Sequence, residues 1–120
     1  MPESFEIHPE RQLVTCRMWG TMTNEDLRGH YERLVADPAF NPEYRQLGDV
    51  RDVTDFAVDS RAIEEVARMR VFTAGARRAF IAPTGVAYGL TRMFSMYSAS
   101  DGQVMEVFTD AGNAEEWLGL

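Results

Sequence analysis

The stretch from Arg45 to Val71 reads RQLGDVRDVTDFAVDSRAIEEVARMRV and predicts the centre of the fold. Its first part, about Arg45 to Val53, has the pattern of a central strand, and the acidic segment after it predicts a loop. Asp59 or Ser60 is expected to cap the helix that follows. The apolar side chains of that helix recur at helical spacing and are Ile63, Val66, Ala67, Val71 and Ala74, with Gly75 as the expected stop.

The segments before this stretch predict a hairpin and a helix. Ser4 to His8 and Leu13 to Gly20 read as two strands joined by a polar turn. Thr23, with Asp26 three residues later, is close to a capping box and predicts a helix start. That helix is expected to end at Asp37-Pro38. Its predicted buried stripe consists of Leu27, Tyr31, Leu34 and Val35.

The segments after it predict two further strand–helix units. The strands are expected at Arg78 to Ala82 and Gln103 to Phe108, and the helices at Gly85 to Ala99 and after a cap at Asp110. The first of these helices has a predicted stripe of Val86, Leu90, Met93, Phe94 and Tyr97, and the second is expected to bury Ala114, Trp117 and Leu118. The order β-β-α-β-α-β-α-β-α predicts an α/β fold with a mostly parallel, mixed five-stranded sheet in a single domain, residues 1–120.

The composition excludes several classes of function. The net charge of -7 disfavours nucleic acid as a partner, because phosphates attract basic surfaces. All 12 basic residues are arginine, so a Schiff-base lysine is excluded. No apolar run approaches the roughly 20 residues of a membrane span, and the single cysteine suits a reducing cytoplasm. We therefore expect a cytoplasmic protein without a membrane span.

The residues that could take part in catalysis or metal binding do not form a catalytic motif. Asp49, Asp52, Asp55 and Asp59 could together supply oxygen ligands for a metal ion, but their spacing favours turn caps and pairing with arginines. His8 and His30 have no ligand-spaced partner and are expected to be surface or hydrogen-bonded histidines, and Cys16 a small core residue. We predict no catalytic residue, no metal site and no cofactor.

The predicted third helix offers a candidate ligand site. Tyr88, Arg92 and Met96 recur at four-residue spacing and form a second row beside the buried stripe. Such a row suits an amphipathic acid, with Arg92 for the carboxylate and the other two side chains for the tail. It equally suits a helix–helix seam or a subunit interface, and the sequence leaves both open.

Three segments, LGDVRDVTDFAVDS, AYGLTRM and AEEWLGL, together with the order of elements, carry a resemblance to a known family. The chain resembles the STAS domains of anti-sigma factor antagonists, and more closely the SpoIIAA-like bacterial branch grouped as STAS/CRAL-TRIO-like. The resemblance implies helices mainly on one face of the sheet. It also implies regulation through a partner protein or binding of a lipid-like small molecule. Ser60, after Asp59, matches the position that is phosphorylated in the antagonists, although on its own Ser60 reads first as a helix cap.

Such an arrangement leaves part of the other sheet face uncovered. Leu13 and Trp19 would then present apolar area to water, and patches of this kind mark interfaces. We therefore predict a homodimer or a regulatory contact there. Two functions stay open: a non-enzymatic STAS-like interaction domain, and a small carrier that buries a lipid-like ligand between the third helix and the sheet.

Overall fold

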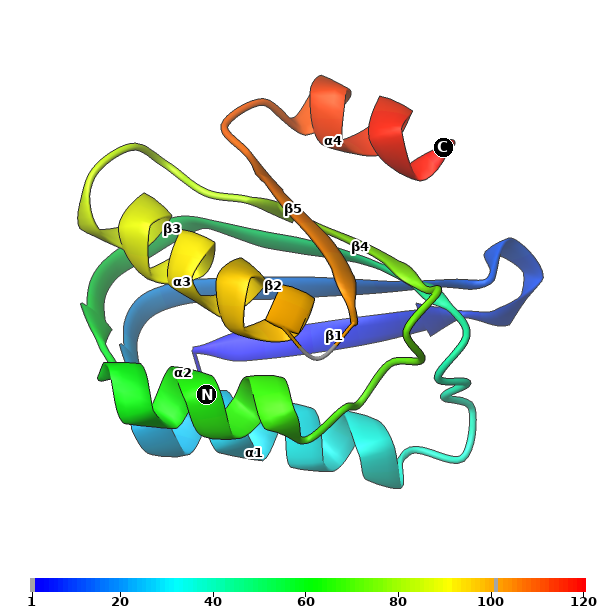
Figure 1. Ribbon diagram of the computed structural model, residues 1–120, viewed down its shortest axis with the longest axis horizontal. Coiled ribbons are helices and arrows are strands. Elements are labelled where there is room, and N and C mark those ends of the chain that lie inside the picture. Colours follow the sequence, from blue (N-terminus) through cyan, green and yellow to red (C-terminus); the bar gives the residue numbers. More distant parts are fainter. Residues whose placement is uncertain (1, 101) are drawn as a thin grey trace.

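The computed structural model describes residues 2–100 and 102–120, and Figure 1 shows a single sheet with helices around it. The strands are β1 (Glu3–His8), β2 (Leu13–Thr23), β3 (Arg45–Ala57), β4 (Arg77–Ile81) and β5 (Val104–Phe108). The α-helices are α1 (Asn24–Ala36), α2 (Ser60–Arg68), α3 (Val86–Ser100) and α4 (Ala111–Leu118). A short 3-10 turn, Pro9–Arg11, closes the hairpin between β1 and β2.

The sheet confirms the predicted architecture. Its strand order is β1-β2-β3-β4-β5, and β1 pairs with β2 antiparallel while the other three pairs are parallel. β3 is therefore the middle strand, as the opening stretch of sequence predicted. It is longer than expected because its pairing with β2 continues to Thr23 and Ala57 through two register shifts.

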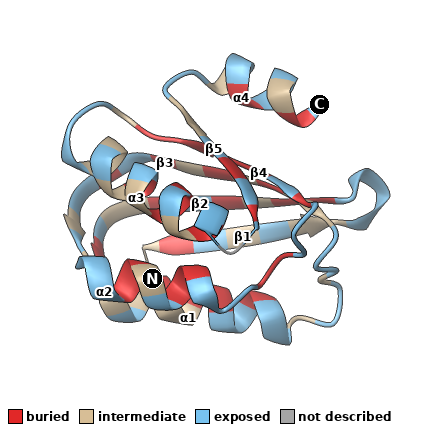
Figure 2. Ribbon diagram, in the orientation of Figure 1, coloured by how far each residue is buried: buried red, intermediate tan, exposed pale blue. Residues whose placement is uncertain are grey.

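Three helices cover one face of the sheet and the fourth covers part of the other. Side chains from α1, α2 and α3 pack with the sheet in the main core, which includes Met18, Leu34, Val50, Ile63 and Phe94. A smaller cluster joins β4 to α4 through Ala79, Ile81, Ala114 and Leu118. Figure 1 shows α4 apart from the other helices, and Figure 2 shows the buried residues along the strands and the inner sides of the helices. Helices mainly on one face were predicted, and the structure confirms this.

The helix starts follow the predicted capping residues, with one correction. Thr23 and Asp26 form a reciprocal capping box at α1, and Asp110 accepts hydrogen bonds from two backbone amides at α4. At α2 the cap is Asp59, whose carboxylate accepts from the amide of Ala62 at 2.9 Å. The prediction that Ser60 is a helix cap is therefore wrong. Ser60 is the first residue of the helix, and the carboxylate of Asp59, a stronger acceptor than a hydroxyl, accepts the hydrogen bond from the Ala62 amide.

The predicted buried stripes of α1 and α2 need two corrections. Val35 is 54% exposed, and fully buried His30 takes a place in the α1 stripe instead. α2 ends at Arg68 and not near Gly75, because the chain reverses through Arg70, whose φ is 52°. Val71 consequently reaches the core from a non-helical segment, and Ala74 is exposed.

Within the described residues, no helix combines the length and the apolar character that crossing a membrane demands.

Candidate functional site

A mostly apolar groove lies along the outer side of α3, next to the end of α2. Its volume is about 560 Å³. The lining residues are Arg68 from α2 and Gly89, Arg92, Met93, Met96, Tyr97 and Ser100 from α3. No acidic side chain among the described residues lines the groove, although the whole chain has 19 acidic residues.

The structure brings two of the three predicted ligand-binding residues into this groove. Arg92 and Met96 line it, whereas Tyr88 is half-buried against the main core. Arg68 and Gly89 also line the groove and were not predicted from the sequence. Arg68 comes from another helix, so no spacing rule connects it to α3, and Gly89 contributes by having no side chain.

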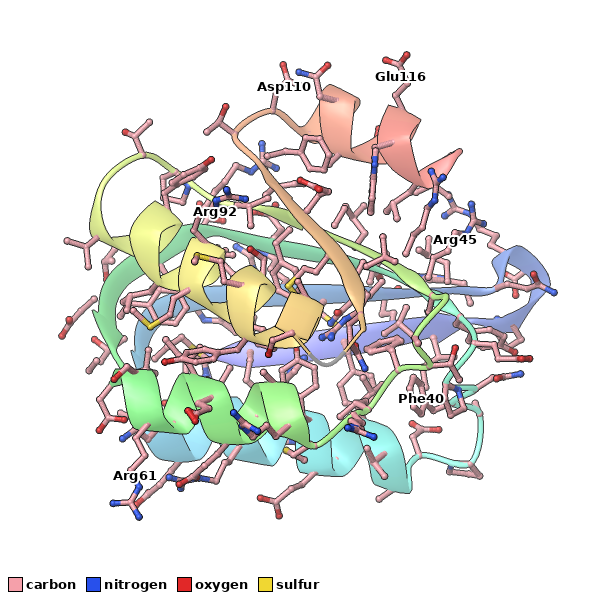
Figure 3. All side chains as sticks on the ribbon, viewed as in Figure 1. Phe40, Arg45, Arg61, Arg92, Asp110 and Glu116 are labelled. Atoms are coloured by element: carbon pink, nitrogen blue, oxygen red, sulfur yellow. The ribbon has the colours of Figure 1, made fainter. Side chains whose placement is uncertain are left out.

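Arg92 is an exposed cation without a partner in the described part of the chain. Its side chain makes no ion pair or hydrogen bond with residues 2–100 and 102–120. Arg68 forms a long ion pair with Glu64, at 3.4 Å between Nη2 and Oε1. Exposed pairs of this kind contribute about 0–1 kcal/mol, so Arg68 can change partner at small cost. Figure 3 shows Arg92 on α3 and Arg61 on the far side of α2.

The inner side of α3 combines hydroxyl residues with apolar side chains, and two large apolar residues of the helix face water. The helix buries Thr91, Phe94, Ser95 and Ser98, so three of its four buried residues carry hydroxyl groups. Val86, predicted in the buried stripe, is 76% exposed, and Met96 is 64% exposed. That stripe is therefore wrong at Val86 and correct at buried Phe94 and at Leu90, Met93 and Tyr97, which pack half-buried against the main core.

Small hydroxyl residues fit on the inner side of α3 because the helix packs closely against the sheet and because the hydroxyls of Thr91 and Ser95 bond within the helix. The Thr91 hydroxyl donates to the carbonyl of Ala87 at 2.7 Å, and the Ser95 hydroxyl donates to the carbonyl of Arg92 at 2.6 Å. These bonds satisfy the buried donors inside the helix itself. The enclosed space between α3 and the sheet is only about 20 Å³ and is lined almost entirely by apolar side chains, among them Met18, Val50 and Phe80.

A buried polar network occupies the core next to α3. The guanidinium of Arg78, only 2% exposed, donates to Gln46 Oε1 at 2.8 Å and to Gln103 Oε1 at 2.9 Å. It also lies over the ring of Phe72, with 4.6 Å between Cζ and the ring centroid. Burial lowers the pKa of Arg78 from its ordinary value, and no carboxylate of the described residues pairs with it. The two acceptors are neutral amides, and their hydrogen bonds fix the position of the Arg78 guanidinium.

The single cysteine belongs to the same network and is confirmed as a core residue. Cys16 is 4% exposed, and its sulfur accepts a hydrogen bond from Gln46 Nε2 at 3.3 Å. Burial raises the pKa of the Cys16 thiol to about 11. A thiol at neutral pH is a poor nucleophile, because the thiolate is the reactive form.

The two histidines lie in different surroundings. His30 is fully buried, and its Nδ1 donates to Oε1 of buried Glu3 at 2.9 Å, while Arg33 pairs with the other oxygen of Glu3. Burial lowers the pKa of His30 by more than Glu3 raises it. Its Nε2 has no hydrogen-bond partner, so a protonated ring would bury an N–H without an acceptor.

His8 lies at the end of β1 and is half-buried. Its Nε2 lies 3.0 Å from Thr15 Oγ1 and 3.8 Å from Glu6 Oε2. Both contacts use the same ring nitrogen, whereas an acid–base relay needs one partner on each nitrogen.

Of the four aspartates in this part of the chain, two in β3 form ion pairs and Asp59 caps α2. Asp49 pairs with Arg51 at 2.8 Å and Asp52 with Arg17 at 2.9 Å, as the sequence analysis favoured. Partial burial acts to raise the pKa of Asp49, but hydrogen bonds from Arg51 lower it overall. Among residues 2–100 and 102–120, no three histidine, cysteine or acidic side chains gather as metal ligands would.

The uncovered sheet face is polar, which corrects one expectation. Leu13 is completely buried and presents no apolar area to water. Trp19 is half-buried, and the guanidinium of Arg17 lies over its ring at 4.9 Å from the centroid. A depression of about 250 Å³ between β1 and β2 includes Ser4, Glu6, Thr15 and Arg17 in its lining. The exposed apolar surface instead includes the outer side of α3.

Comparisons with known proteins support the fold alone. No protein-family model and no curated protein matches the chain. A solved structure from Shewanella loihica, an uncharacterised DUF3478-family protein with a SpoIIAA-like fold, superposes with a TM-score of 0.63 and 18% sequence identity. The match covers 97% of this chain and 93% of that one. The protein therefore has a SpoIIAA-like fold, as the resemblance of the sequence implied.

Proposed function

We propose that the protein is a non-enzymatic, cytoplasmic regulatory or interaction domain that binds a partner protein on the outer side of α3. The observation that carries this proposal is the exposure of two large apolar side chains, Val86 and Met96, on the outer side of α3, with Met96 lining the groove. Large apolar side chains that face water beside a groove are typical of a surface that a partner covers.

The surroundings of the reactive side chains support a function without chemistry. The Cys16 thiol is buried and protonated, and the contacts of His8 share one nitrogen. Asp49 and Asp52 are held by arginines. His8 contacts the Thr15 hydroxyl at 3.0 Å, but its other ring nitrogen has no orienting partner among the described residues.

Affinity capture from extracts of the source organism tests the proposal. The wild type is compared with Gly89→Leu, which fills the groove, and with Arg61→Glu, which changes an exposed arginine outside it. We expect a protein that the wild type and Arg61→Glu retain and Gly89→Leu loses. Identical retained proteins for all three variants would place the binding surface elsewhere.

The second candidate function is a carrier for an amphipathic lipid-like ligand, which the groove beside Arg92 favours. The enclosed space under α3 weighs against it, because about 20 Å³ is far below the roughly 300 Å³ of a small-ligand pocket. Native mass spectrometry of the purified protein separates the two functions. A co-purified amphipathic acid, lost from Arg92→Glu, would support the carrier.

Regulation at Ser60 is a further part of the proposal that rests on the resemblance. Ser60 is exposed at the start of α2, and its hydroxyl makes no hydrogen bond with the described residues. A phosphate there would meet the first amides of the helix but also the carboxylate of Asp59. The intact mass of protein isolated from its source cells would show whether the phosphate is present.

We also propose a homodimer. The uncovered sheet face near Trp19 is polar and Leu13 is buried, so this face offers a second copy less apolar area than the sequence predicted. Light scattering at micromolar concentration measures the subunit number directly.

A further inference from the structure

The groove between α2 and α3 has a shape and a charge that point to one class of occupant. We infer that it binds an acidic amphipathic helix of a partner protein, with apolar side chains over Met93 and Met96 and carboxylates on Arg92 and Arg68. This inference rests on the proposed function and names the chemistry of the partner.

The shape of the groove favours a helix over a small ligand. The groove is open to water along the surface of α3, and the enclosed space under the helix holds about 20 Å³. An acyl chain lying in an open groove would leave one of its sides in water. An amphipathic helix supplies its own polar side to water and buries its apolar side in the groove.

The length of the groove matches a short helix. The lining residues of α3 run from Gly89 to Ser100, which corresponds to about 16 Å, or three turns, at ~1.5 Å per residue. A helix of this length presents apolar anchors at positions i, i+3 or i+4, and i+7. Gly89 leaves open space for one of them, because a Cβ at that position would have no neighbour within 4 Å.

The charges of the groove select an acidic partner. Arg92 has no ion-pair partner in the described part of the chain, and Arg68 is held only by the exposed pair with Glu64. In a protein of net charge -7, a groove with two guanidinium groups and no carboxylate from residues 2–100 and 102–120 is locally complementary to acidic side chains. α3 itself has no acidic residue.

Titration with designed peptides tests the inference directly. The probes are two fluorescent 15-residue peptides with leucines at helical anchor spacing, one with glutamates and one with lysines on the flanks. Fluorescence anisotropy with the full chain at low ionic strength measures both affinities. We expect the glutamate peptide to bind at least about tenfold more tightly, and its affinity to fall as salt is added.

Variants locate the binding and separate charge from shape. Arg92→Glu is expected to weaken the glutamate peptide about tenfold, whereas Arg61→Glu, with the same change of charge outside the groove, leaves it within about twofold. Gly89→Leu is expected to abolish binding of both peptides, and Gly89→Ala reports whether the helix tolerates a side chain there.

Several results would overturn the inference. They are equal affinity for both peptides, equal losses in Arg92→Glu and Arg61→Glu, and no binding of the glutamate peptide at 1 mM (roughly the weakest specific affinity). Oleate binding that depends on Arg92, without peptide binding, would favour the carrier instead. If a protein captured from extracts is lost from Gly89→Leu but the glutamate peptide does not bind, the proposed function stands and the inference of an acidic helix as the partner is wrong.

Discussion

Replacing Gly48 with alanine should destabilise the protein through one identifiable contact. Gly48 lies opposite Phe80 in the pairing of β3 with β4, and the Phe80 ring covers the glycine. A Cβ at Gly48 would lie 2.5 Å from Cε2 and 2.7 Å from Cδ2 of that ring. Carbon atoms prefer separations of about 3.5–4.0 Å, so the ring must move by about 1 Å.

The surroundings of Phe80 determine the size of the effect. The ring is 2% exposed, and the enclosed space beside it, about 20 Å³, is too small to receive it. Overpacking of this kind costs about 1–3 kcal/mol. The lower entropy of the unfolded alanine chain offsets part of that cost, by about 0.4–1 kcal/mol. We therefore expect Gly48→Ala to lower the free energy of unfolding by about 1–2 kcal/mol.

Urea unfolding followed by circular dichroism measures this loss, with an unchanged m-value showing that the unfolded state is the same. Gly75→Ala is the matched control, since its Cβ would meet nothing within 4 Å and the glycine has no positive φ. We expect it to be neutral or stabilising. In a double-mutant cycle, the loss of unfolding free energy caused by Gly48→Ala should be smaller by at least about 1 kcal/mol in the Phe80→Leu background than in the wild type. Additive effects, or a Gly48→Ala protein as stable as the wild type, would refute the contact with Phe80 as the cause.

Three further predictions concern helices and protonation. Gly89→Ala should raise the free energy of unfolding by about 0.5–1 kcal/mol, because alanine favours the helix and its Cβ meets no neighbour; urea unfolding measures this. Asp110→Ala should lower that free energy by about 1 kcal/mol, because two amides of α4 lose their acceptor, and Asp110→Asn should restore most of it. The pKa of His30 is lowered in the folded protein, so the unfolded chain takes up a proton first as the pH falls below its ordinary value of 6.5. The free energy of unfolding should therefore fall between pH 7.5 and pH 5.5 (roughly one unit either side of that value), and a wild-type slope equal to that of His30→Gln would contradict this.

The sequence predicted the fold well because its local signals agree with the tertiary structure. Thr23 with Asp26, Asp59, and Asp110 each mark a helix start that the structure confirms. The strand that begins at Arg45 is the middle strand of the sheet, as its pattern of apolar residues indicated. The errors occur where tertiary contacts override the local pattern. Val71, for example, is buried in the core although α2 ends before it, at Arg68.

The site was only partly predictable because it depends on two elements and on an absent side chain. Arg92 and Met96 could be found from their spacing on one helix, whereas Arg68 reaches the groove from α2. The buried position of Arg78 had no sequence signal, since its acceptors Gln46 and Gln103 lie on a neighbouring strand and before β5. Periodicity assigns apolar residues to the core, and this rule misplaced Val86.

The exposed apolar residues of α3 connect the packing of this helix with the proposed function. Burying Val86 and Met96 instead of Ser95 and Ser98 would remove more apolar area from water, at about 25 cal/mol per Å². The hydroxyl of Ser98 is buried without a hydrogen-bond partner, which carries a further cost. Phe94, with Leu90, Met93 and Tyr97 beside it, packs against the main core and accounts for this orientation of the helix, which leaves Val86 and Met96 in water. A partner that covers the outer side of α3 recovers the apolar contribution on binding, and it finds in Arg92 a cation with no partner among the described residues.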